Sequence, residues 1–146
     1  VSRKRGYINM AKYQTNKTKR AVYNTLRCIG VMLFGQNRFK QPKFLENAAQ
    51  KDKYEVWLGM IDEGKINEVE NELIEETEQR RPDMHPSESE KMAMLEVALQ
   101  IYKYINDKDD AFLERSSYSR EEVEEGILSV MHILHIDTDM ICRLLL

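Results

Sequence analysis

Apolar side chains recur every three or four residues along most of this 146-residue chain, a spacing typical of amphipathic helices. Near the N-terminus, Val22, Leu26, Ile29 and Leu33 fall on one helical face, and later segments repeat the pattern. No run alternates apolar and polar residues between turn signals, as a half-buried strand would. The sequence therefore predicts an all-α fold, a bundle of five to six helices arranged as antiparallel helical hairpins.

Polar residues indicate where several of these helices begin. In the stretch YSREEVEEGI, residues 118–127, Ser119 and Glu122 have the spacing of a capping box, in which each side chain accepts a hydrogen bond from the other residue's backbone N–H. The same spacing predicts helix starts at Ser87 and Asn67. Gly126 lies inside the last of these helices, where the missing side chain predicts the close approach of another helix.

Charge is divided unevenly along the chain. Residues 1–43 contain eleven Lys or Arg and no Asp or Glu, whereas the remaining residues contain eleven basic and 25 acidic side chains. Such asymmetry indicates either an anionic partner or pairing of the two parts with each other. We expect residues 1–17 to form a basic, flexible arm and residues 18–146 to form a single helical domain.

The basic residues of the N-terminal part alternate with Tyr7, Tyr13 and Tyr23, which suits phosphate contacts combined with base stacking. Two other interpretations stay open. The segment is also suited to an anionic membrane surface, or it stays solvated, or pairs with acidic neighbours, while its apolar stripe packs into the core. The candidate contacts to an anionic partner, all within residues 1–27, are Arg3, Lys4, Arg5, Lys12, Lys17, Lys19, Arg20 and Arg27.

Two further surfaces are candidates for protein partners. Aromatic residues of the acidic part are expected to line a groove between helices, and they are Tyr54, Trp57, Tyr102 and Tyr104. The first helix, over residues 18–35, is apolar nearly all round in its last turns, so it needs cover from the core, a second subunit or lipid. A homodimer through this helix is one expectation.

Signatures of enzyme chemistry are absent from the sequence. It contains no GxGxxG, no phosphate-binding Walker loop and no GxSxG, and Cys28 and Cys142 belong to no CxxC pair. His132 and His135 lie three residues apart, but one local pair does not supply the ligands of a metal site. We therefore predict a non-enzymatic interaction or scaffold module with no metal or cofactor. The alternative is a nucleic-acid-associated protein that uses the basic arm and first helix.

The hydropathy of the chain bears on its location. The longest apolar run, residues 28–34, is far shorter than the roughly 20 residues that span a bilayer, and no cleavage signal follows it. We expect a protein without a transmembrane segment, located in the cytoplasm, with free thiols.

Three segments resemble a known family. LRCIGVMLFGQ at residues 26–36, EGKINEVENELIEE at 63–76 and ALQIYKYINDKDDAFLERSSYSREEVEEGI at 98–127 resemble small helical proteins of Gram-positive bacteria whose function is not assigned. The resemblance extends over residues 18–136 and implies an all-helical domain without assigned catalytic residues. The spacing from Gly64 to Val69 also resembles the turn of a tetratricopeptide repeat, and it implies one repeat-like helical hairpin.

Overall fold

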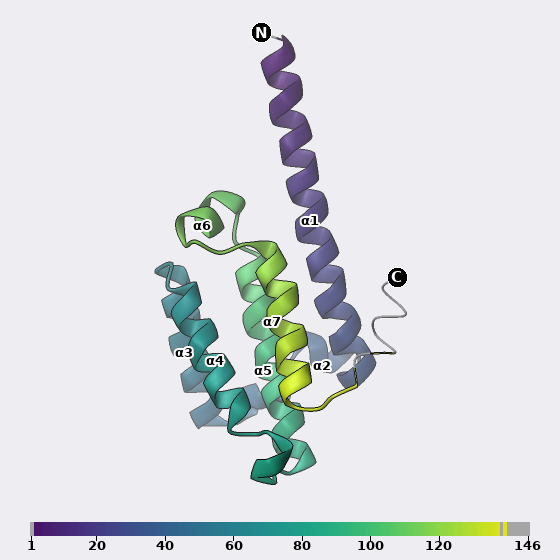
Figure 1. The fold of residues 1–146 in the computed structure, drawn as a ribbon, viewed down its shortest axis with the longest axis vertical. Helices are drawn as coiled ribbons and strands as arrows, with labels where there is room; N and C mark the ends of the chain where they lie inside the picture. The colour runs from purple at the N-terminus through teal and green to yellow at the C-terminus, as the bar shows by residue number, and fades with distance from the viewer. Residues whose placement is uncertain (1, 138, 140–146) are drawn as a thin grey trace.

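The computed structural model describes residues 2–137 and 139, with side chains from Lys17 onward. These residues form seven α-helices and two 3-10 helices, without a strand, so the predicted all-α class is confirmed (Figure 1). The count exceeds five to six because the predicted connector after residue 35 contains an extra short helix, α2. The elements are α1 Ser2–Phe34, α2 Gln36–Lys40, η1 Lys43–Glu46, α3 Ala48–Asp62, α4 Ile66–Glu78, η2 Pro82–Met84, α5 Glu88–Asn106, α6 Asp110–Arg115 and α7 Arg120–Ile133.

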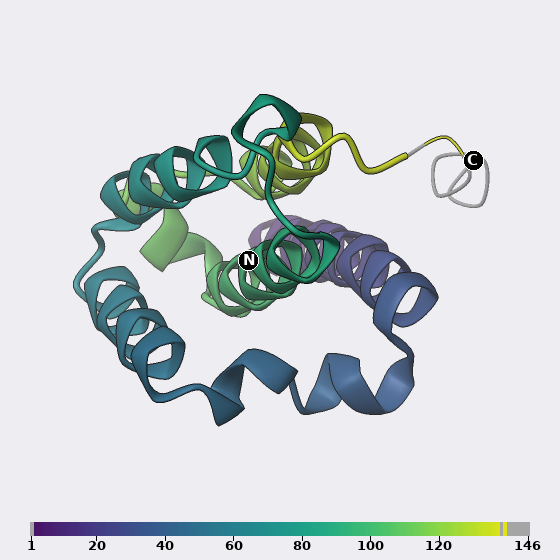
Figure 2. The ribbon, with the colours of Figure 1, turned by 90° about the horizontal axis from the view of Figure 1, so that it is seen from below.

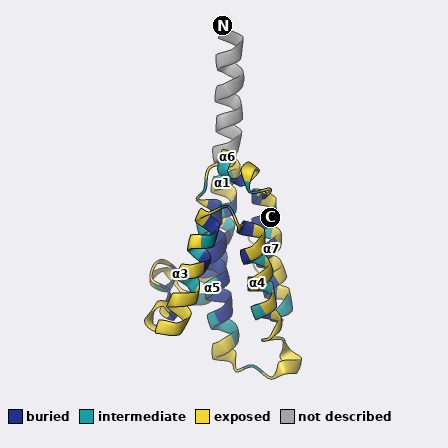
Figure 3. Ribbon diagram, turned by 90° about the vertical axis from the view of Figure 1, so that its left-hand side faces the viewer, coloured by how far each residue is buried: buried dark blue, intermediate teal, exposed yellow. Residues whose placement is uncertain are grey.

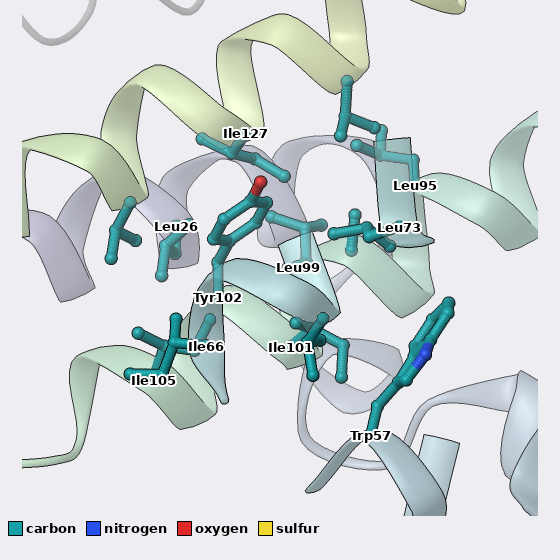
Figure 4. Packing of buried hydrophobic residues seen from close by; sticks show 14 of the residues in the cluster. Leu26, Trp57, Ile66, Leu73, Leu95, Leu99, Ile101, Tyr102, Ile105 and Ile127 are labelled. Carbon is teal, nitrogen blue, oxygen red and sulfur yellow. The ribbon is translucent and has the colours of Figure 1, made fainter. Parts of the chain in front are cut away.

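Helix α5 is the centre of the molecule. Seen along the bundle, α1, α2, η1, α3, α4 and α7 lie around it (Figure 2). Ten of its 19 residues are buried, among them Leu95, Leu99 and Tyr102, which contact side chains of the surrounding helices (Figure 4). The outer helices bury only their inner faces (Figure 3). Burial of apolar side chains around α5 is therefore the main source of stability.

Helix α1 enters this core through the predicted stripe. Val22, Leu26 and Ile29 are buried, because α5 and α7 both pack against that face. Gly35, with φ of 86°, ends the helix as predicted. Towards the N-terminus the backbone of α1 continues to Ser2 without a break at residue 17, and its first half extends past the other helices (Figure 1). The flexibility of residues 1–17 stays a prediction.

The connector after α1 is held by polar side chains of α5. The buried carboxylate of Glu96 accepts hydrogen bonds from Arg38 Nε at 2.6 Å and from the backbone N–H of Phe44 at 3.1 Å. Gln100 donates from Nε2 to the carbonyl oxygen of Phe39 at 2.9 Å. These bonds satisfy polar groups that the short elements α2 and η1 leave unpaired, which explains why polar residues occupy an otherwise apolar helix.

The predicted caps are correct at two of three positions. Ser119 and Glu122 form a complete capping box at α7, and the Ser87 hydroxyl accepts from the backbone N–H of Glu90 at α5. The prediction for Asn67 is wrong, because α4 already begins at Ile66. The Asn67 amide donates instead to the carbonyl oxygens of residues 116 and 117 and ties the α3–α4 turn to the segment before α7.

Gly126 provides a direct test of this packing, because Tyr102 of α5 fills the space beside it. A Cβ atom at position 126 would lie 2.2 Å from the Tyr102 hydroxyl oxygen and 2.4 Å from Cζ. Tyr102 has no exposed surface and cannot move aside without disturbing the core. We expect Gly126→Ala to lower the free energy of unfolding by about 2–3 kcal/mol, measured by urea denaturation.

Gly59 in α3 is the matched control for this substitution. A Cβ atom there would have no neighbour within 4 Å. We expect Gly59→Ala to raise the free energy of unfolding by about 0.5–1 kcal/mol, because alanine favours the helix. Equal effects of the two substitutions would contradict the close approach of α5 and α7.

Candidate functional site

The four aromatic residues predicted to share a groove lie in different places. Tyr54 and Trp57 line a pocket between α3, α4 and α5, with Met94 among its apolar walls. Its volume of about 90 Å³ is small beside the roughly 300–1,000 Å³ of ligand pockets. Tyr102 is in the core, and the Tyr104 hydroxyl donates to Asp62 Oδ1 at 2.7 Å. The structure thus brings Tyr54 and Trp57 together and places Tyr102 and Tyr104 outside that pocket.

A larger depression runs between α4 and α7, and we call it the α4–α7 groove. Its volume is about 650 Å³, and three of its lining residues are glutamates while none is Lys or Arg. Leu128 is 37% exposed there and lies with the half-buried Ile74 and Ile133 in the lining, which gives the groove an apolar strip. The lining residues are Glu70, Ile74, Glu122, Glu125, Gly126, Leu128, Ser129, His132 and Ile133.

Glu70 is fixed in the wall of this groove by two tyrosines. The hydroxyl of Tyr118 donates to Glu70 Oε2 at 2.5 Å, and the hydroxyl of Tyr102 donates to the same oxygen at 3.1 Å. Burial, and then the neighbouring carboxylate, raise the pKa values of both tyrosines far above the usual range. Both hydroxyls therefore stay protonated at neutral pH and hold the carboxylate of α4 against α5 and the segment before α7.

This arrangement depends on local features that are visible in the sequence. Gly126 leaves room for the Tyr102 ring beside α7, so the predicted close approach is confirmed, here by a side chain of α5. In Figure 4 the Tyr102 hydroxyl points towards α7, next to Ile127. Tyr118 precedes the capping box and is buried, which places its hydroxyl near α4. The sequence predicted Glu70 only as the partner of Asn67 in a capping box and missed its place in the groove wall, because Tyr102 and Tyr118 are distant from it in the sequence.

The predicted cationic contacts divide into three groups. The structure describes side chains only from residue 17 onward, so the predicted contacts of four residues lie outside the described part: Arg3, Lys4, Arg5 and Lys12. Along α1, the exposed residues are Lys17, Arg20 and Arg27. Lys19 instead donates to the carbonyl oxygen of Asp107 at 3.1 Å. This carbonyl lies at the C-terminal end of α5, where the helix dipole is negative and a positive charge is stabilising.

The histidines do not form a metal site within residues 17–137 and 139. His132 is exposed in the α4–α7 groove, and His135 is exposed just after α7 with φ of 55°. No group of three or more His, Cys, Asp or Glu in that part of the chain is arranged to hold an ion. Cys142 lies outside the described residues.

Ser129 and His132 are the groups in the groove that most resemble a nucleophile and its base. A serine nucleophile needs a base within hydrogen-bonding distance. Both side chains are exposed, and no hydrogen bond joins them in the described structure. The side chains that the groove presents are mainly acidic and apolar. Within the described residues, no helix has the length and hydropathy needed to cross a bilayer.

The two tyrosines on Glu70 predict a loss of stability in alkali. Above about pH 10, the unfolded chain releases tyrosine protons that the folded chain keeps, so the free energy of unfolding falls by about 1.4 kcal/mol per pH unit for each of Tyr102 and Tyr118. The Tyr118→Phe variant should show a slope shallower by about 1.4 kcal/mol per pH unit in urea denaturation between about pH 10 and about pH 12. Parallel slopes for variant and wild type would contradict the raised pKa of Tyr118.

Comparison with known proteins bears on the whole domain rather than on the groove alone. No curated protein and no solved structure matches the chain. A sequence family does match, over residues 12–135, which include α2 to α7 and most of α1. The expected resemblance to an uncharacterised helical family is confirmed at this level. The chain belongs to the family of unknown function DUF6483.

Proposed function

We propose that this domain is a non-enzymatic interaction module and that its α4–α7 groove binds a basic amphipathic helix of a protein partner. One observation carries the proposal: the groove combines three glutamates with an exposed apolar strip and has no Lys or Arg in its lining. Helices in grooves are recognised through an apolar face, and charges at the rim select the sign of the partner.

The rigidity of the groove supports this function. Glu70 is held by two tyrosine hydroxyls, and the Glu122 carboxylate accepts a hydrogen bond from the backbone N–H of Ser119 at 2.7 Å. A wall whose carboxylates are already fixed loses little conformational entropy when a partner binds. Glu125 is exposed and supplies the remaining charge.

The architecture around the groove supports the module interpretation in a second way. The helices α3 and α4 are joined by a short turn at Gly64 and lie side by side as a hairpin (Figure 1). Such a hairpin fits the tetratricopeptide-like interpretation of the Gly64–Val69 spacing, and helical repeats of this kind bind peptides. A cytoplasmic location in a Gram-positive bacterium is part of the same proposal.

Nucleic-acid binding through α1 is the second candidate. Its support is that Lys17, Arg20 and Arg27 are exposed on one helix. The same helix buries Val22, Leu26 and Ile29 in the core, so these cations would act from its outer surface. The excess of acidic residues after position 43 would repel phosphates elsewhere on the molecule.

Binding of a designed peptide tests the groove. We expect a fluorescent leucine–lysine helix of about 14 residues to bind the protein at low salt, and its leucine–glutamate counterpart not to bind. Glu125→Lys should weaken binding by about tenfold, or about 1.4 kcal/mol, in fluorescence polarisation, because it replaces an attraction with a repulsion.

Glu121→Lys is the control, since residue 121 is exposed on α7 and does not line the groove. The two variants have the same net charge, so a general electrostatic effect would weaken binding equally in both. Equal weakening would refute binding in the groove. Binding of both peptides with the same affinity would refute the role of its charge.

A further inference from the structure

We propose that the partner of the α4–α7 groove is a second copy of this chain. The N-terminal half of α1, residues 2–17, would lie in the groove of the other copy, and the exchange would be reciprocal. This inference rests on the proposed function, because it names the occupant of the same groove. It differs from a homodimer through residues 18–35, whose apolar stripe is already buried within one copy.

Charge complementarity is the first argument. Residues 2–17 contain five basic side chains, Arg3, Lys4, Arg5, Lys12 and Lys17, and no acidic one. The groove contains three glutamates and no Lys or Arg. All charged residues within positions 1–43 are basic, and acidic residues are in large excess after position 43. The strongest electrostatic attraction available to the chain is therefore between these two parts.

The apolar pattern of the same segment is the second argument. Tyr7, Met10 and Ala11 follow the spacing i, i+3 and i+4, which places them on one helical face. An apolar face of this kind is what a helix presents to a groove. The groove offers Ile74, Leu128 and Ile133 to meet it.

Helix geometry decides between the chain's own groove and that of a second copy. The backbone of α1 is one continuous helix from Ser2 to Phe34, and its first half extends past the end of its own bundle (Figure 1). A straight helix cannot fold back onto α4 and α7 of the same copy without breaking. A second bundle placed beyond that end can receive it.

The dimensions of the two parts agree. Residues 2–17 form a helix about 24 Å long, at 1.5 Å per residue. Helices α4 and α7, with 13 and 14 residues, are about 20 Å long. Each copy has one basic helix and one groove, so two copies related by a two-fold axis satisfy both sites and leave none open for further growth.

Charge exchange between two variants tests this arrangement. The first variant carries Arg3→Glu, Arg5→Glu and Lys12→Glu, which makes its arm acidic. The second carries Glu125→Lys, Ser129→Lys and His132→Lys, which sets three lysines against the remaining Glu70 and Glu122 and makes its groove basic; all three substituted residues are exposed. Wild type should dimerise at about 50 mM salt and dissociate at about 500 mM in sedimentation velocity. Each variant alone should be monomeric at low salt, because like charges meet at both sites.

An equimolar mixture of the two variants should form a heterodimer. In it the acidic arm meets the basic groove and the basic arm meets the acidic groove, so both contacts are attractive again. The control Glu121→Lys/Asn71→Lys/Gln79→Lys makes the same change in net charge as the groove variant at three exposed positions outside the groove. It should remain dimeric.

Four results would overturn the inference: a wild type that stays monomeric at low salt, a mixture of variants that stays monomeric, a dimer that persists in the arm variant, or dissociation by the control. If peptide binding in the groove succeeds while the chain stays monomeric, the module proposal stands and only the second copy is refuted. If the wild-type monomer binds a random DNA duplex and the arm variant does not, the arm binds nucleic acid rather than a second copy.

Discussion

The burial of α5 is the constraint on which the rest of this structure depends. A helix with more than half of its residues buried must be surrounded, and the chain meets this need by placing the other helices around it (Figure 2). The burial also explains the polar residues of α5. Glu96 and Gln100 face the connector and bind a side chain and two backbone groups that the hydrogen bonds within the two very short helices do not satisfy. The same helix supplies Tyr102, which links the core to the α4–α7 groove.

The link between Tyr102 and the groove fixes the position of one of the groove's carboxylates. A surface glutamate normally moves freely and contributes little to binding specificity. Glu70 differs because Tyr102 and Tyr118, from two separate parts of the chain, donate to one of its oxygens. The groove wall is thus an extension of the packed interior. A partner that binds there would meet a carboxylate that is already held in position. A substitution in the core that moves Tyr102 would also change the position of this carboxylate in the groove.

The sequence predicted the fold well where a pattern is local. Helical spacing identified the stripe of α1, and the capping box at Ser119 marked the start of α7. It failed where the outcome depends on a distant contact. Nothing near Asn67 shows that its amide binds the segment before α7, and α2 is too short for its spacing to be recognised. The aromatic groove was an inference from residue type, and burial of Tyr102 is decided by Gly126, 24 positions further along the chain.

The pairing of Tyr102 with Gly126 has a consequence for the history of the family. The ring occupies the volume that any larger residue at position 126 would need, and a smaller residue at position 102 would leave a void and release Glu70. Neither site can change alone at low cost. Related chains should therefore keep both residues or replace them together. Wherever the pair is replaced, the residue at position 70 should lack the hydrogen bond that Tyr102 donates here.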